Sequence, residues 1–333
     1  MKTGVAYFGS RDPRHVRTDL EDMRKHHCNM VIHTFSEEDY NFYALVMKEI
    51  VSISHELGFE VYIDPWGVGG VFGGEAFSRF VMQNPGECQR LASGAPAPAA
   101  CLNSPAFLAF MKSWVDFAAT AGADIVFWDE PHFYITPTTW IASQKSDEWA
   151  CACDRCRGLF RQKFGRDLPV AMDGDVIAFR DESIVSFFKT LTEYSQKTHS
   201  MKNALCVLPD ENPLMGVSSW DLLASLPSIS IFGTDPYWML WNKPLLDYVR
   251  ASTRRIIDIC SRFGKEPQMW VQAFLIYEGR EEEVGQVARI MAQEGIKNIA
   301  AWSYRGGAYM NLKSVHHEQV WKILGEAFGE MRK

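Results

Sequence analysis

An apolar run leads directly into two adjacent acids in the segment DIVFWDEPH, residues 124–132. The run is typical of a strand buried on both faces. In a parallel α/β barrel, the carboxyl ends of the strands carry the chemistry. Asp129 and Glu130 would meet there beside Trp128, and their pKa values would be pushed apart. Such a pair can protonate a leaving oxygen, which favours glycosidic bond cleavage. The alternative is a strand-end turn with solvated acids.

A second acid follows another apolar run in the same way. Residues 229–233 lead to Asp235, which is followed by proline and aromatic residues. Proline favours an extended conformation in the residue before it and so orients that side chain. Asp235 is therefore the preferred partner of Glu130, the expected general acid and base. In a second arrangement, Asp129 is the nucleophile and Asp235 the acid.

The spacing of the two carboxyl groups decides the stereochemistry of such a reaction. A separation of about 5 Å implies a covalent intermediate and retention, whereas roughly 6.5–9.5 Å leaves room for an attacking water and inversion. The sequence leaves both open.

Other polar and aromatic residues near the expected strand ends are candidates for binding a sugar. Aromatic rings offer platforms for the apolar face of a pyranose, and Trp302 is the preferred platform. Arg305 could pair with a substrate carboxylate or with one of the acids. The candidates are His33, Asp64, Trp66, His132, Glu211, Tyr237, Trp238, Gln272, Trp302, Tyr304 and Arg305.

Three cysteines lie within six residues, at Cys151, Cys153 and Cys156. Zinc prefers four tetrahedral ligands, and a fourth thiolate could come from Cys101 on the preceding long loop. Such a closed sulfur shell would be a structural zinc site. Cys88 is a competing fourth ligand, and a cluster of reduced thiols is the alternative to a metal site.

Short apolar runs alternate with amphipathic helices along the chain. This order is typical of a parallel sheet wrapped by helices. Strands are expected at 4–8, 30–34, 60–64, 124–128, 204–208, 229–233, 269–274 and 299–303. Eight such units predict a single (β/α)8 barrel over residues 1–333, with elongated loops after strands three and four. The Ala/Pro segment at 95–100 is either part of the site or a loose surface insertion.

Composition excludes several classes of function. The formal net charge is −7, and no basic run is interleaved with aromatics, so neither nucleic acid nor an anionic membrane is expected as a partner. No secretion signal or membrane-spanning run is apparent, which predicts reduced thiols and a cytoplasmic location. The Gly-rich segment 67–74 lacks the ending of a phosphate loop, so no organic cofactor is expected. The sequence leaves the oligomeric state undecided, and a homo-oligomer is possible.

The acid-Glu-Pro strand end, the C-x-C-x2-C cluster and the Phe160-Arg161 pair that follows it resemble the family 42 β-galactosidases and related clan A glycoside hydrolases. The resemblance implies that Glu130 is the acid/base and that Cys101 completes a zinc site. It also implies a nucleophilic glutamate at the end of strand seven, but residues 269–276 contain no acid. Glu278 lies just beyond, where it either reaches inward or caps the next helix. The chain is also too short for that family's accessory domains.

Two other functions compete with hydrolysis. A metal-dependent sugar isomerase or lyase could use histidine and acid ligands on the same strand ends. A carbohydrate-binding barrel without catalysis would explain the missing acid on strand seven.

Overall fold

Eight parallel strands close into a barrel in the computed structural model, which describes residues 1–8, 11–136 and 148–332. Their hydrogen-bonded order is β1-β10-β9-β8-β7-β6-β3-β2. The strands are β1 (Lys2–Tyr7), β2 (Met30–Thr34), β3 (Glu60–Asp64), β6 (Ile125–Asp129), β7 (Lys202–Val207), β8 (Ile231–Thr234), β9 (Glu266–Gln272) and β10 (Asn298–Trp302). The predicted (β/α)8 barrel is confirmed.

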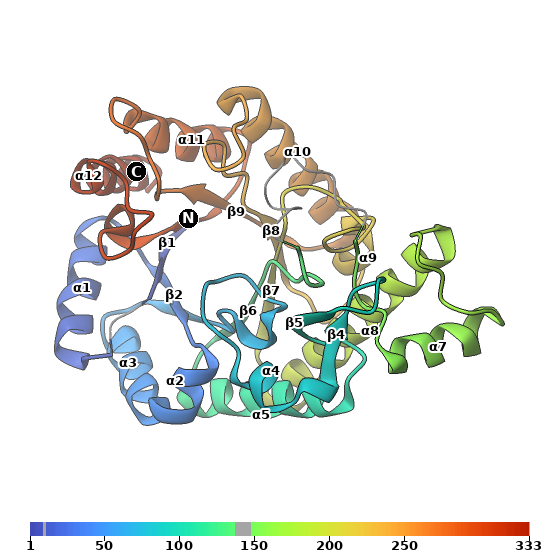
Figure 1. Ribbon diagram of the computed structural model, residues 1–333. Helices are drawn as coiled ribbons and strands as arrows, with labels where there is room; N and C mark the ends of the chain where they lie inside the picture. The colour runs from blue at the N-terminus through green and yellow to red at the C-terminus, as the bar shows by residue number, and fades with distance from the viewer. Residues whose placement is uncertain (9–10, 137–147, 333) are drawn as a thin grey trace.

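Helices form an outer ring around these strands (Figure 1). They are α1 (Pro13–Lys25), α2 (Glu37–Phe42), α3 (Ala44–Glu56), α5 (Pro105–Ala121), α8 (Gly174–His199), α9 (Trp220–Ala224), α10 (Leu245–Phe263), α11 (Glu282–Gln293) and α12 (His317–Glu330). A further helix, α7 (Asp154–Phe164), projects to one side of the ring (Figure 1). None of the described helices is both long and apolar enough to cross a membrane.

The boundaries of the strands agree with the sequence pattern to within a few residues. β2 and β3 have the predicted bounds, and β6 is shifted by one residue. β9 starts at Glu266, three residues earlier than predicted, because polar side chains are accommodated at that end of the barrel. Inside it, Gln268 Nε2 donates a hydrogen bond of 2.9 Å to Asn298 Oδ1. The apolar pattern alone therefore underestimates the length of this strand.

Alternate residues of each strand face the barrel interior, as the period of two requires. On β6, Ile125 and Phe127 belong to the interior cluster, and Trp128 belongs to the outer one. The indole of Trp128 packs on α8 through Phe188 and donates to Asn203 Oδ1. The prediction that the acid pair lies beside Trp128 is therefore wrong, because the alternation turns that ring outward.

Both long loops predicted at the barrel rim are present, after β3 and after β6. The first contains the 3-10 helix Val68–Gly70, helix α4 (Arg79–Gln83), the 3-10 helix Pro85–Glu87 and an antiparallel pair of strands, β4 (Cys88–Arg90) and β5 (Pro96–Ala100). The Ala/Pro segment is thus an ordered strand of the rim. The second loop joins the same pair, because Ala152 N donates to Arg90 O and Ala92 N donates to Trp149 O.

Candidate active site

Three aspartates lie at the carboxyl ends of β3, β6 and β8. Asp64 and Asp129 continue the inward sequence of Tyr62 and Phe127, which face the barrel interior. Asp235 directly follows β8 and is buried, with 3% of its surface exposed. Alternation along the strands therefore brings acids from three strands to one end of the barrel, as the sequence predicted.

Glu130 takes an unusual backbone conformation. Its φ of 38° lies in the left-handed region, although a residue before proline was expected to be extended. Its N–H donates to Cys206 O at 2.9 Å, and its carbonyl accepts a hydrogen bond of 2.6 Å from His132 Nδ1. Non-glycine residues in this region are held by their surroundings, often at functional sites. Here the fixed backbone turns the Glu130 side chain toward Asp235.

Burial raises the pKa of all four carboxyl groups at this end of the barrel, and mutual repulsion adds to the effect for the three aspartates. Glu130 and Asp235 share a hydrogen bond, which raises the pKa of Asp235 and lowers that of Glu130. The two groups are therefore placed to share one proton. Within the described chain, no lysine or arginine contributes to the pKa of any of the four groups.

Gly73 of the first rim loop lies against the acids. A methyl group there would clash with the Asp129 carboxylate, since it would lie 2.9 Å from Cγ of that residue. It would lie 3.2 Å from Glu130 Oε2, so Asp129 Cγ and Glu130 Oε2 are at most about 6.1 Å apart, the sum of the two distances. This limit joins a carboxyl carbon to a carboxyl oxygen, so the two acids are close neighbours and the limit itself allows the spacing of retaining glycosidases.

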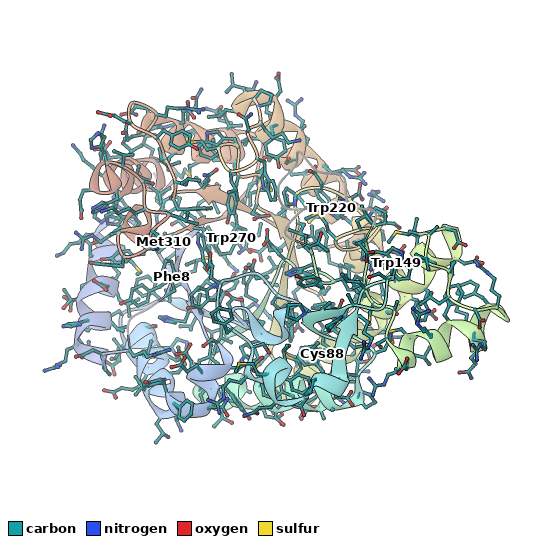
Figure 2. All side chains as sticks on the ribbon, viewed as in Figure 1. Phe8, Cys88, Trp149, Trp220, Trp270 and Met310 are labelled. Atoms are coloured by element: carbon teal, nitrogen blue, oxygen red, sulfur yellow. The ribbon has the colours of Figure 1, made fainter. Side chains whose placement is uncertain are left out.

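A cavity of about 460 Å³ opens over the acids. Asp129, Glu130, Asp235 and His132 line it, together with the predicted Tyr237 and Trp302. Trp302 is stacked on Phe8, with ring centroids 5.6 Å apart, and Figure 2 labels Phe8 on this side of the barrel. Burial lowers the pKa of His132, so its ring is neutral near pH 7, with Nδ1 as donor and Nε2 left as an acceptor.

His33 faces away from this cavity. It follows the inward Ile32 on β2, so the alternation directs it toward α3, where Nε2 is 2.9 Å from Ser54 Oγ. Burial lowers its pKa to about 3. His33 and Trp66 instead line a smaller cavity of about 170 Å³ near α2 and α3. The prediction that His33 belongs with the acids is therefore wrong.

Three other predicted binding residues support the fold around the site. Gln272 Oε1 accepts from the N–H groups of Met239 and Leu240, which fixes the loop after β8. Trp238 is buried, and its indole donates to Glu283 at 2.7 Å. Glu211 accepts from Trp220 N and pairs with Arg255 at 3.1 Å. Among the described residues, the lining of the 460 Å³ cavity includes none of Gln272, Trp238 and Glu211.

The remaining candidates near β9 and β10 are also engaged elsewhere. Tyr304 Oη donates to Asp19 and Asp22 of α1, and Arg305 pairs with Glu318 of α12. The Glu278 side chain is 80% exposed and lies 3.6 Å from His316. It is therefore placed as a surface residue, contrary to the prediction that includes it among the catalytic acids.

Several residues of the cavity were not predicted. Gly73 and Glu75 belong to the rim loop after β3, and Phe274 follows β9. An acid and a pair of glycines on a long rim loop were the available signal for the first two. Phe274 stands close to a strand end, where the barrel pattern already places the chemistry.

The four predicted cysteines form a buried cluster. The sulfur atoms of Cys101, Cys151, Cys153 and Cys156 all lie within 4.8 Å of one another, and each thiol is free. Cys101 Sγ is 3.5 Å from Cys156 Sγ and 3.7 Å from Cys153 Sγ. Tetrahedral sulfurs at about 2.3 Å from a zinc ion are about 3.8 Å apart. The cluster therefore fits a tetrahedral metal ion.

Cys88 is not part of this cluster, so the competing ligand set is wrong. Its sulfur contacts Val81 O and Asn84 O instead. A buried arginine, Arg180, lies near the cluster and stacks on Phe133 at 3.9 Å and Trp149 at 5.9 Å (Figure 2 labels Trp149). It is close enough to Cys151 and Cys156 to interact with their charge. A cation here would offset the excess negative charge of four thiolates around a divalent ion.

Comparison with known proteins gives similarity in fold alone. No family model matches the sequence, and no curated protein matches it. The solved endo-1,4-β-mannanase of Rhizomucor miehei is similar with a TM-score of 0.67 and 11% identity, covering 99% of this chain and 94% of that chain. The GH5_18 protein of Streptomyces cattleya, solved in complex with GlcNAc, gives 0.63 and 9%, covering 100% and 80%.

A D-psicose 3-epimerase of Clostridium cellulolyticum H10, solved with D-tagatose, is similar with a TM-score of 0.53 and 12% identity, covering 100% of this chain and 98% of that chain. The barrel is thus shared with glycosidases and with an epimerase. Fold alone does not choose between those chemistries, so the choice has to be made from the site.

Replacement of Gly73 by alanine tests the geometry of the acids. The added methyl group would displace the Asp129 carboxylate. We therefore expect the rate of hydrolysis of aryl glycosides, the reaction proposed below, to fall about 100-fold, with little change in the melting temperature. Gly86→Ala is the matched control, because a methyl group there meets nothing within 4 Å. Equal activity of the two variants would contradict this arrangement.

Replacement of Asp64 by asparagine tests how much the burial of this acid lowers the free energy of unfolding. Both oxygens of Asp64 lack a hydrogen-bond partner, and its pKa is raised by burial. The native state therefore keeps a proton that the unfolded chain releases above about pH 4, so stability falls as the pH rises. We expect Asp64→Asn to raise the melting temperature by a few degrees at pH 8 and less at pH 5, measured by calorimetry. A larger gain at pH 5 would contradict the assigned direction.

Proposed function

We propose that the whole chain, residues 1–333, is the catalytic domain of a glycoside hydrolase that cleaves an O-glycosidic bond. The observation that carries the proposal is the meeting of Asp129, Glu130 and Asp235 on one cavity with aromatic walls. Carboxyl groups with raised pKa values can hold a proton near neutral pH and deliver it to a leaving oxygen. Aromatic rings bind the apolar face of a sugar.

In the proposed reaction, the proton that Glu130 and Asp235 share passes from Glu130 to the glycosidic oxygen, and both groups then stay ionised until the second step. Asp129, whose carboxyl carbon is at most about 6.1 Å from Glu130 Oε2, attacks the anomeric carbon as the leaving group departs. Water then attacks the glycosyl-enzyme ester, and Glu130 accepts its proton. The upper limit on the spacing allows this retaining route. Trp302, stacked on Phe8, would support the sugar ring.

Two alternatives have less support from the geometry. His33 and Glu211, which an isomerase could use as metal ligands, point away from the acids. Within the described chain, the cysteine cluster is the one set of three or more such groups whose ligand atoms lie within 4.8 Å. A binding protein without catalysis would have no need for proton sharing between Glu130 and Asp235.

Replacement of Glu130 by glutamine tests the hydrolase. Glutamine keeps the shape but cannot donate the catalytic proton, so we expect kcat/KM on a panel of aryl glycosides to fall about 10²–10⁴-fold. Glu193→Gln on the surface of α8 is the control and should keep wild-type rates. Normal hydrolysis by Glu130→Gln would refute the role of Glu130, and no hydrolysis by the wild type across the panel would favour a binding protein.

Azide rescue separates the roles of the two acids. In Glu130→Ala, azide should attack the glycosyl-enzyme and give a glycosyl azide with the configuration of the substrate. In Asp129→Ala, azide should attack the substrate directly and give the opposite configuration. Product configuration is read by NMR. If Asp235→Ala gives the inverted azide and Asp129→Ala gives none, Asp235 is the nucleophile.

We also propose that Cys101, Cys151, Cys153 and Cys156 hold a structural zinc ion. The ion would link the end of β5 to the start of α7 and supply only structural stability, because four sulfur ligands leave no position for substrate. Pro98 on β5 lines the cavity and touches the Gly-rich loop at Gly70. The metal site would therefore hold one wall of the cavity in place.

Removal of one ligand tests the metal site. We expect Cys156→Ser to lower the zinc content from one ion per chain and to lower the melting temperature by several degrees, because metal binding contributes to folding. Cys88→Ser is the control, since Cys88 lies outside the cluster. Zinc content is measured by atomic absorption. Zinc-free wild-type protein with an unchanged melting temperature would disprove the proposal.

A further inference from the structure

All the charged side chains described in the lining of the cavity are acidic. They are Glu75, Asp129, Glu130 and Asp235, and the described lining includes no lysine or arginine. The nearby Arg305 is paired with Glu318. His132 is held with Nδ1 as donor, so its other nitrogen is a further acceptor. The described walls of the cavity thus concentrate acidic groups and hydrogen-bond acceptors, which a bound cation would favour in their ionised form.

A second observation shows that these acceptors are not satisfied within the described protein. Asp235 is 3% exposed and lines the cavity, yet its Oδ1 has no hydrogen-bond partner. Behind it, Asp64 is fully buried, and neither of its oxygens has a partner. Buried acceptors of this kind are costly unless a donor reaches them. For Asp235, which lines the cavity, the missing donor can come from the ligand or from solvent there.

We propose that the sugar bound in this cavity carries a protonated amino group, so that the substrate is a glycoside of an amino sugar whose amine is not acetylated. This inference rests on the proposed function and names its substrate class. An ammonium group supplies three donors and one positive charge, whereas a hydroxyl group supplies one donor and no charge. The aromatic rings of Tyr237, Phe274, Trp241 and Trp302 also line the cavity and favour a cation over their faces.

A neutral sugar would not need this many acids. A two-carboxylate glycosidase requires one proton donor and one carboxylate, and Glu130 with Asp129 suffices for that. Asp64, Asp235 and Glu75 add further acidic groups near the same place without a cation in the described lining, and a bound cation would relieve the mutual repulsion that raises the pKa values of the aspartates. Glu75 stands at the exposed edge of the cavity and is near enough to interact with Asp129 and Glu130. It is therefore the residue best suited to change selectivity without removing the proton donor.

Calorimetric titration with matched sugars tests the proposal. Glucosamine, galactosamine and mannosamine would each be compared at pH 6 with the parent sugar and its N-acetyl form. In at least one series we expect the amine to bind about tenfold more tightly than both neutral forms, as a charge-assisted hydrogen bond allows. The preference should disappear as the pH rises through the pKa of the amine. It should also shrink in Glu75→Gln but not in the surface variant Glu193→Gln.

Hydrolysis of aryl glycosides of the same sugars, with and without the free amine, separates the two proposals. Tighter binding of an amine with no cleavage of any glycoside would keep this inference and refute the hydrolase. Cleavage of neutral glycosides at rates equal to or above those of the amino glycosides would refute the inference and keep the hydrolase. Equal or weaker binding of the amines in all three series at pH 6, or no binding at millimolar concentrations, would also overturn it.

Discussion

The burial of acids at one end of the barrel, without a cation among the described residues, is the constraint on which the other features of this protein depend. The side chains of Asp64 and Asp129 point into the barrel, because each lies two residues after an inward residue, Tyr62 or Phe127, on its strand. Asp64 is fully buried, and Asp129 lines the cavity beside other acids, so desolvation and repulsion raise the pKa values of both. Native proteins tolerate such a cost at functional sites, where the rest of the fold provides compensating stability.

The composition of the rim loop after β3 is related to the same constraint. The loop passes so close to the carboxyl groups that it has room for glycine but not for a residue with a side chain. Gly70 and Gly73 let the loop after β3 lie directly against Pro98 and Asp129, where any side chain would clash. A loop of this composition has little rigidity of its own. The strand pair β4–β5 and its hydrogen bonds to residues 149–152 supply that rigidity, and the cysteine cluster lies at the far end of β5.

The sequence predicted those parts of the structure that depend on local pattern. Apolar runs located the strands, and strand ends located Asp129, Glu130 and Asp235. The cysteine cluster was found because its spacing is itself the signal. Predictions failed where a tertiary partner decides the outcome. Gln272 and Arg305 lie at the predicted strand ends. Gln272, however, accepts a hydrogen bond from the backbone of the loop after β8, and Arg305 pairs with a glutamate of α12. His33 has the opposite parity to Ile32, but the continuous apolar run before it gives no sign of which parity faces inward.

The contact between Glu130 and Asp235 agrees with their predicted partnership, but the left-handed backbone of Glu130 could not be predicted, since a residue before proline favours an extended conformation. That contact also bears on the choice among the chemistries that share this barrel. A divalent metal is bound by ionised carboxylates that turn their oxygens to the ion, not to each other. Two acids that share a proton are instead prepared for proton transfer. The arrangement of Glu130 and Asp235 therefore fits the acid–base role that we propose for Glu130.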